Sequence, residues 1–236
     1  MSVTDPGRAP GRAPSAQGAE VGRRLGAGVM HGLWRPRVLG AWKVPPSGPA
    51  ILAVNHTHLI DGPLLLGTAP RPVHFLIKKE AFVGPLGPFL RSIGQLKVDR
   101  SGTDRTAVLE ALGVLKGGGV LGIFPEGTRG VGDFASLRSG LAYFAVRSGA
   151  PIVPVAVLGT AERVPGGRGR PRGLRLIPGL PPLRSRVDVV FGDPFEAGGS
   201  GTGVVRRTRA ALDEATVHIQ RRLTAHLESA RRITGR

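Results

Sequence analysis

Two side chains that could do acid–base chemistry, His56 and Asp61, follow the short apolar run Ile51-Leu52-Ala53-Val54. On an α-helix, five steps of 100° would place the two side chains about 140° apart, so they could not meet on one helical face. We therefore expect a turn, followed by a helix with Asp61 as its N-cap and Gly62-Pro63 in its first turn, where Pro is favoured. In this geometry the carboxylate could face the imidazole.

A histidine held by a carboxylate is a general base poised near neutral pH, because the carboxylate stabilises the imidazolium that forms during proton transfer. Such a pair can deprotonate a hydroxyl group. The structural alternative is that Asp61 only caps the helix and His56 only bonds a loop carbonyl, since so short a motif often matches by chance. A further alternative is a small metal site of His56, His58 and Asp61, although no fourth ligand is apparent.

A second group of polar residues lies in Phe124-Pro125-Glu126-Gly127-Thr128-Arg129, again after a strand-like run. The Gly turn carries a carboxylate, a hydroxyl and a guanidinium, and the planar guanidinium of Arg129 suits bidentate binding of phosphate. No GxSxG sequence is present, which counts against a serine hydrolase of the α/β type.

These motifs resemble the glycerolipid acyltransferase superfamily, and in particular the 1-acyl-sn-glycerol-3-phosphate (lysophosphatidic acid) acyltransferase family. The resemblance rests on Asn55-His56 with Asp61, on Phe124 to Arg129, and on three further blocks in the family's order: Lys79-Glu80-Ala81-Phe82, Gly94 to Arg100, and Pro151 to Val155. It covers roughly residues 45 to 195. Several ordered motifs together make a specific signal.

The resemblance implies transfer of a fatty acyl group from a thioester, acyl-coenzyme A or acyl carrier protein, to the free hydroxyl of a lysophospholipid. The implied acceptor is 1-acylglycerol-3-phosphate and the product phosphatidic acid, with no metal or other cofactor. His58 stands where the family commonly has Ser. Another lysolipid or amphipathic acceptor, such as a lyso-ornithine lipid, therefore stays open.

The resemblance also assigns roles to individual residues. His56 would be the general base and Asp61 its orienting partner. Arg100, Arg129 and Lys79 would hold the acceptor's phosphate, with Lys78 an equally good choice of lysine from sequence alone. The loop residues Glu126, Gly127 and Thr128 would bind the substrate, with Glu126 and Thr128 shaping the loop or touching the glycerol.

Composition points to anionic partners. The chain has 33 basic and 16 acidic residues, a formal charge of +17. Such a field attracts an anionic membrane surface, a phosphorylated substrate, an acidic carrier protein or nucleic acid. Aromatic residues are few and do not alternate with basic ones, so we expect no nucleic-acid partner. A non-enzymatic basic membrane- or nucleic-acid-binding protein would explain the charge but not the ordered motifs. Cysteine is absent, which excludes a thiol nucleophile and disulfides.

The pattern along the chain predicts three parts. Residues 1 to 20 are expected to be a disordered tail, residues 21 to 44 a basic amphipathic segment near a membrane, with Trp34 and Trp42 at headgroup level. Residues 45 to 236 would form the acyltransferase domain, including a C-terminal helix over 204 to 232. The pattern of residues 21 to 44 fits a helix packed on the domain equally well. Gly26, Gly28 and Gly32 weaken the prediction of a helix in this segment.

The fold class follows from short apolar runs alternating with helical patterns. Strands are expected at 51–54, 73–77, 95–98, 120–124, 152–158, 175–177 and 187–191. One helix is expected to be capped by Thr103 and to end at Lys116-Gly117, and another to run from about Ser136 to Ser148. This arrangement is typical of a single-domain α/β sandwich with a central, mostly buried β-sheet flanked by helices. No run of about eighteen apolar residues is present. We therefore expect a peripheral protein at the cytoplasmic face of the cell membrane.

Overall fold

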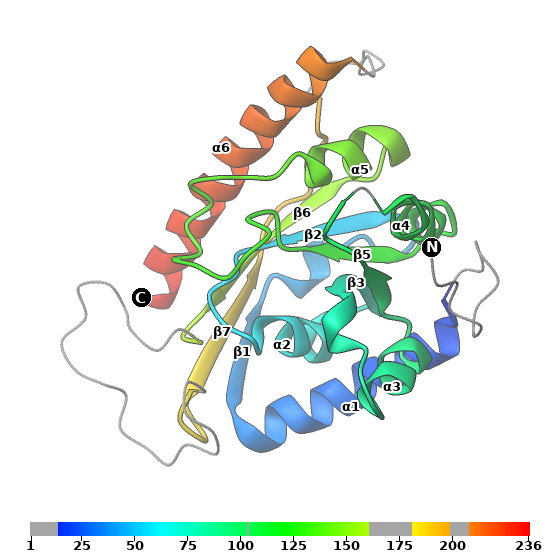
Figure 1. Ribbon diagram of the computed structural model, residues 1–236. Helices are drawn as coiled ribbons and strands as arrows, with labels where there is room; N and C mark the ends of the chain where they lie inside the picture. The colour runs from blue at the N-terminus through cyan, green and yellow to red at the C-terminus, as the bar shows by residue number, and fades with distance from the viewer. Residues whose placement is uncertain (1–13, 103, 161–180, 199–207) are drawn as a thin grey trace.

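The computed structural model describes residues 14–102, 104–160, 181–198 and 208–236 (Figure 1). Its centre is one seven-stranded sheet in the order β1-β7-β6-β2-β5-β3-β4, in which only the β6–β7 pair is antiparallel. The strands are β1 (Arg35–Leu39), β2 (Ala50–Val54), β3 (Val73–Lys78), β4 (Leu96–Val98), β5 (Val120–Ile123), β6 (Ile152–Leu158) and β7 (Arg186–Phe191). The predicted α/β fold class is confirmed.

Helices cover both faces of the sheet. They are α1 (Ala16–Leu33), α2 (Asp61–Thr68), α3 (Leu86–Ser92), α4 (Arg105–Lys116), α5 (Gly140–Ser148) and α6 (Arg209–Thr234), with short 3-10 turns η1 (Ala41–Lys43) and η2 (Lys79–Ala81). Figure 1 shows α1 and α2 on one side of the sheet and α5 and α6 on the other. The sheet is thus the middle layer of a sandwich.

Strand β2 lies in the middle of the sheet and is fully buried. Its side chains alternate between two cores: Leu52 and Val54 pack with α1 and α2, whereas Ile51 and Ala53 pack with α4, α5 and α6. This alternation is the period of two expected for a strand. Because both faces are covered, the strand is apolar throughout, which is why its sequence stands out.

The predicted parts of residues 1 to 44 need correction. Helix α1 begins at Ala16 with Ser15 as its cap, so the tail predicted as disordered up to Glu20 is helical from Ala16; residues 1–13 lie outside the described part. Strand β1 pairs with β7 inside the sheet. Residues 21 to 44 are therefore an integral layer of the domain and not a separate segment.

Close backbone packing accounts for two glycines of α1, Gly22 and Gly26, whereas a Cβ at Gly28 or Gly32 would meet nothing within 4 Å. A Cβ at Gly26 would lie 3.2 Å from the backbone of Gly67 in α2, and one at Gly22 would lie 2.7 Å from Ile93. Only residues without a side chain allow the two helices to approach so closely. The alternative that this segment packs on the domain is confirmed. Trp34 is buried, so it is not the headgroup anchor that we expected, whereas Trp42 is exposed.

The other predicted elements are found with shifted ends. The structure has strands at six of the seven predicted runs, and the run at 175–177 lies outside the described residues. Helix α4 is capped by Asp104, next to the undescribed Thr103, and α5 begins at Gly140 instead of about Ser136. Helix α6 is described from Arg209 and ends at Thr234, two residues beyond the predicted end.

The strand directions define one edge of the sheet, here called the motif edge. Strands β2, β3, β4, β5 and β6 end there, and β7 and β1 begin there, because β7 runs antiparallel to β6 and β1 runs parallel to β7. Open α/β sheets bind their ligands outside the carboxyl ends of their strands. The motif edge is therefore where a substrate site is expected, and His56 follows β2 there.

Candidate active site

His56 and Asp61 meet as predicted. The imidazole Nδ1 lies 3.2 Å from Asp61 Oδ2. A carboxylate can only accept a hydrogen bond, so Nδ1 carries the hydrogen and Nε2 carries the lone pair of the neutral ring. The His56 side chain is partly exposed and Asp61 is fully buried. The geometry is that of a general base oriented by a carboxylate.

Asp61 accepts from four groups and does not cap α2. Oδ2 accepts from the backbone N–H of Thr57 at 2.8 Å and of His58 at 2.7 Å, as well as from His56. Oδ1 accepts from the Thr160 hydroxyl at 2.7 Å. The N-cap of α2 is Ile60, so the predicted capping role is wrong. The carboxylate instead folds the turn between β2 and α2, which brings it to the imidazole.

The backbone of His56 is held from both sides by the Phe124–Arg129 loop and its extension. Its N–H donates to Glu126 Oε2 at 3.0 Å, and its carbonyl accepts from the Gly130 N–H at 3.0 Å. Glu126 Oε1 accepts from the Phe134 N–H at 3.0 Å. Both carboxylate oxygens of Glu126 thus bond the backbone, which favours loop shaping among its two predicted roles.

The imidazole is also stacked on an aromatic ring. The ring centroids of His56 and Phe124 are 4.1 Å apart and the planes lie 25° from parallel, and Phe75 stacks on the far side of Phe124 at 5.6 Å. Stacking of this kind fixes the orientation of the ring. The base is therefore held by hydrogen bonds at its backbone and its Nδ1 and by apolar contact on its face.

The predicted phosphate-binding residues gather at the same edge. Arg100 donates to the carbonyl of Gly127 at 2.8 Å, which joins the loop after β4 to the loop after β5. Gly127 has a φ of 74°, a conformation that favours glycine, and thereby turns the loop. Thr128 and Arg129 are exposed at its tip. The structure thus brings two predicted arginines to one loop pair beside the base.

Lys79 is engaged in an ion pair. Its Nζ lies 2.6 Å from Asp99 Oδ2, and this hydrogen bond raises the pKa of Lys79 and lowers the pKa of Asp99. The pair is exposed, so its attraction is screened by water. Asp99 offsets the charge that Lys79 would offer to a phosphate, which leaves Arg100 and Arg129 as the stronger candidates.

His58 turns toward its own backbone. Its Nδ1 lies 3.3 Å from the N–H of Ile60. Within the described residues, no group of three His, Cys, Asp or Glu side chains is placed to hold a metal ion. The Asp61 oxygens that the metal alternative would require are already bonded to four donors.

Two residues that position the base were missed from sequence. The buried Asn55 side chain bonds both the N–H and the carbonyl of Val157, which fixes the end of β2 against β6. Thr160, also buried, donates to Asp61 and lies 3.0 Å from the Thr57 hydroxyl. Thr160 is 99 residues from Asp61, so no local pattern could connect them. Asn55 directly precedes His56, but the sequence alone assigns no role to it.

Thr160→Val should lower turnover about tenfold, because it removes one hydrogen bond to a charged, buried carboxylate. The measurement is steady-state acyl transfer together with its pH profile, since a displaced Asp61 also alters the base's protonation. Thr160→Ser keeps the hydroxyl and should stay near wild type. Thr68→Val removes a buried hydroxyl that bonds Leu64 and serves as the matched control. An equal loss in Thr160→Ser would assign the effect to packing.

Comparison with known proteins gives the family. The Acyltransferase family model matches residues 35–158, just over half of the chain. A 1-acyl-sn-glycerol-3-phosphate acyltransferase of Bacillus subtilis is 32% identical over 128 residues, covering 53% of this chain and 64% of that protein. A 1-acyl-sn-glycerol-3-phosphate acyltransferase of Borreliella burgdorferi is 30% identical over 127 residues, which cover 52% of this chain and 51% of that protein. The chain thus spans from about half to just under two thirds of these relatives' length.

A solved structure shares the fold. The 1-acyl-sn-glycerophosphate acyltransferase of Thermotoga maritima superposes with a TM-score of 0.63 over 90% of this chain and 78% of that one, at 24% identity. The family match begins at Arg35, the first residue of β1, which agrees with the place of β1 in the sheet. With the family model covering the motif edge from β1 to the end of β6, this chain belongs to the acyltransferase family.

Proposed function

We propose that the protein transfers a fatty acyl group from an acyl thioester to the free hydroxyl of 1-acylglycerol-3-phosphate, giving phosphatidic acid. One observation carries the proposal: an imidazole whose Nδ1 is bonded to a buried carboxylate stands at the end of β2, beside a loop pair that bears Arg100 and Arg129. Relatives named as acyltransferases for this acceptor support the choice.

The reaction needs no covalent enzyme intermediate. Nε2 of His56 takes the proton of the acceptor hydroxyl while its oxygen attacks the thioester carbonyl, and Asp61 stabilises the imidazolium. The new C–O bond forms a tetrahedral intermediate. When this collapses, the C–S bond breaks and the thiolate leaves with the proton from the imidazolium. The acceptor's phosphate would lie against Arg100 and Arg129, which positions its hydroxyl before the base.

The test is product formation by the purified protein. It is incubated with lysophosphatidic acid and either acyl-coenzyme A or acyl carrier protein loaded with the same chain, and extracted lipids are analysed by mass spectrometry. Phosphatidic acid carrying the donor's chain is the expected product. Acylation of another lysolipid with lysophosphatidic acid left unchanged would reassign the acceptor. Retention of nucleic acid without any acyl transfer would refute the enzyme.

Arg129→Lys should weaken apparent affinity for the phosphorylated acceptor by roughly 1.5 to 3 kcal/mol, the range for a hydrogen bond to a charged group. Lysine keeps the charge but loses the fork that binds two phosphate oxygens. The measurement is KM for acceptor and donor, and donor KM should change much less. Arg147→Lys, an exposed arginine at the end of α5, is the matched control. Equal losses for both substrates would indicate a structural role for the loop.

The acceptor is a bilayer lipid, and we propose that α1 docks the protein on the cytoplasmic face of the membrane. Val21, Leu25 and Val29 recur every four residues on α1 and are each about half exposed. They form a half-exposed stripe along α1, beside Gly22 and Gly26, which pack inward. The C-terminal end of α1 leads into β1 at the motif edge. No helix among the described residues is long and apolar enough to cross a bilayer. The stripe and the positive charge would together hold the protein at the surface.

The double variant Leu25→Glu with Val29→Glu should reduce co-sedimentation with anionic vesicles about tenfold or more, because two apolar contacts become charges facing lipid. Deleting residues 1 to 44 would be a poor test, since it removes β1. Leu109→Glu, which changes a more exposed leucine on α4, is the control. Transfer to detergent-dispersed acceptor should survive in both. If the α1 variant sediments like wild type, α1 does not face the membrane.

A further inference from the structure

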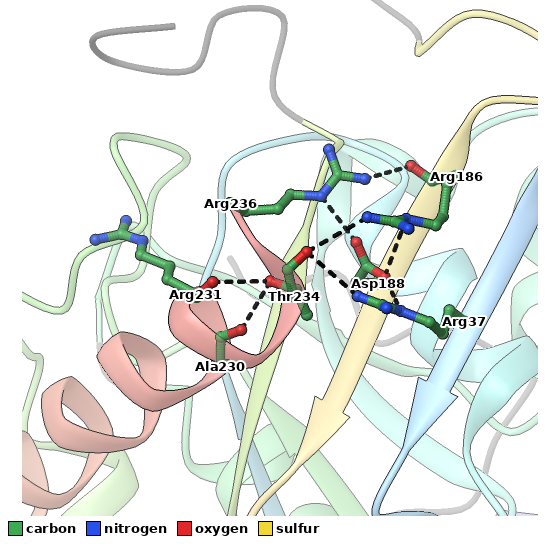
Figure 2. Close-up of polar contacts among 7 residues, drawn as sticks. All are labelled: Arg37, Arg186, Asp188, Ala230, Arg231, Thr234 and Arg236. Atoms are coloured by element: carbon green, nitrogen blue, oxygen red, sulfur yellow. Dashed lines mark hydrogen bonds and ion pairs between the residues drawn. The ribbon is translucent and has the colours of Figure 1, made fainter.

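Three arginines converge on one buried carboxylate where β1, β7 and the end of α6 meet (Figure 2). Asp188 of β7 is fully buried. Its Oδ1 lies 2.6 Å from Arg37 Nε and 3.6 Å from Arg186 Nε, and its Oδ2 lies 2.8 Å from Arg236 Nε. Arg37 and Arg186 also reach the carbonyl of Thr234, at 3.5 and 3.4 Å.

Positive charge exceeds negative charge in this cluster. One carboxylate faces three guanidinium groups, and Arg35 adds a fourth, because it pairs with Arg186 in the register and lies two residues from Arg37 on the same face of β1. Arg37 and Arg236 satisfy Asp188 at close range. Arg186 makes only long contacts with Asp188 and Thr234 and is half exposed, and Arg35 is exposed. Arg37 and Arg236 are therefore sufficient to anchor the end of α6 on Asp188, and this anchoring does not require Arg35 or Arg186.

The cluster lies at the motif edge, on the other side of His56 from the acceptor residues. From β2, which carries His56, the sheet continues through β6 and β7 to β1, whereas Arg100 and the Arg129 loop follow β4 and β5 in the opposite direction. Three strand spacings separate β2 from β1, about 14 Å in all. The guanidinium of Arg236 also packs against Gly159, where a Cβ would come within 2.6 Å of it, next to Thr160.

The cluster faces away from the surface formed by α1. Arg37 and Asp188 bond the end of α6, so they lie on the α6 side of the sheet, whereas α1 packs on the other side with α2. A bilayer against the α1 stripe would therefore not lie flat on these arginines. An extended, soluble substrate that enters along the motif edge would pass them.

We propose that Arg35 and Arg186, supported by the Arg37–Asp188–Arg236 ion pairs, bind the phosphate of a phosphopantetheine thioester, the acyl donor of the proposed function. Coenzyme A and acyl carrier protein share this phosphopantetheine arm, an extended chain that separates the thioester from the phosphate. The donor's carbonyl then reaches His56 from the β1 side, while the acceptor's phosphate is held on the β5 side. The two anionic groups are thus kept apart on opposite sides of one base.

The test uses the full chain and the double variant Arg35→Gln with Arg186→Gln. Asp188 keeps its two close partners in this variant, so its thermal unfolding should match wild type. Coenzyme A binding, measured by calorimetry, should weaken about tenfold or more, the effect expected when charge-assisted contacts to a phosphate are lost. Arg147→Gln with Arg209→Gln, which removes two exposed arginines at the end of α5 and the start of α6, is the charge-matched control and should bind like wild type.

A comparison of KM values for donors with and without the phosphate tests whether Arg35 and Arg186 bind that group. KM for acyl-coenzyme A or acyl carrier protein should rise in the double variant, whereas KM for acyl-pantetheine, which lacks the phosphate, should not. Equal changes for donors with and without phosphate would overturn the proposal, as would unchanged binding of coenzyme A. Loss of vesicle binding with donor KM unchanged would assign the cluster to lipid headgroups instead. If the wild type binds coenzyme A through these arginines but acylates no lysolipid, the proposed function fails and the site stands.

Discussion

Replacing His56 by Ala should lower turnover by about 10² to 10⁴, the usual share of general-base catalysis, and leave the fold intact. The backbone contacts of His56 with Glu126 and Gly130 do not involve its side chain, so the loops that surround the site should stay in place. The measurement is the single-turnover rate at saturating donor and acceptor, with thermal unfolding as the check on folding. Substrate affinities should change little, since the imidazole acts mainly in the transition state.

His58→Ser is the matched control two residues away. The variant carries serine, which the family commonly has at this position. It keeps the hydrogen bond from the backbone N–H of residue 58 to Asp61, because that bond does not involve the side chain. Its turnover should remain near wild type. If His58→Ser abolishes turnover and His56→Ala retains it, the general base is His58. The hydrogen bond between His56 Nδ1 and Asp61 would then have a structural role.

The buried strands could be predicted because their sequences are constrained on both faces. The runs at β2, β5 and β6 are short and apolar, and each is bounded by turn residues, so their position and the α/β class followed directly. Strand β1 could not be found in this way. It begins Arg35-Pro36-Arg37 and forms the outer edge of the sheet, where proline and charged residues are tolerated because one side of the backbone is not paired.

The site was predictable where its residues are close in sequence and not where they come from distant strands. His56 and Asp61 lie five residues apart, and only a turn lets them meet, so their contact could be expected. Thr160 reaches Asp61 from the end of β6, and Glu126 reaches the His56 backbone from the loop after β5. Such contacts depend on strand order, which places β6 and β5 on either side of β2. Sequence spacing contains no information about that order.

Asp61→Asn should lower turnover about as much as His56→Ala, by roughly 10² to 10⁴, with the nearly isosteric amide filling the same space. An amide oxygen can accept from some of the four donors that now meet the carboxylate, but the amide nitrogen cannot accept from any. The imidazole therefore loses its fixed tautomer and the charge that stabilises the imidazolium. Some loss of stability is also expected, because buried donors are left without an acceptor. The rate is therefore measured well below the unfolding temperature of the variant.

The double variant of His56→Ala and Asp61→Asn shows whether Asp61 acts by orienting His56 or by supporting the fold of the turn. If Asp61 acts through His56, the double variant His56→Ala with Asp61→Asn should turn over no more slowly than the slower single variant, because residues that act as a unit lose their function only once. Independent roles would instead multiply the two losses. The same cycle with Thr160→Val extends the argument, since Thr160 donates to Asp61 and should add nothing once Asp61 is Asn. Multiplied losses in either cycle would mean that Asp61 and Thr160 support the fold of the turn, and that His56 is oriented mainly by Phe124 and the Glu126 loop.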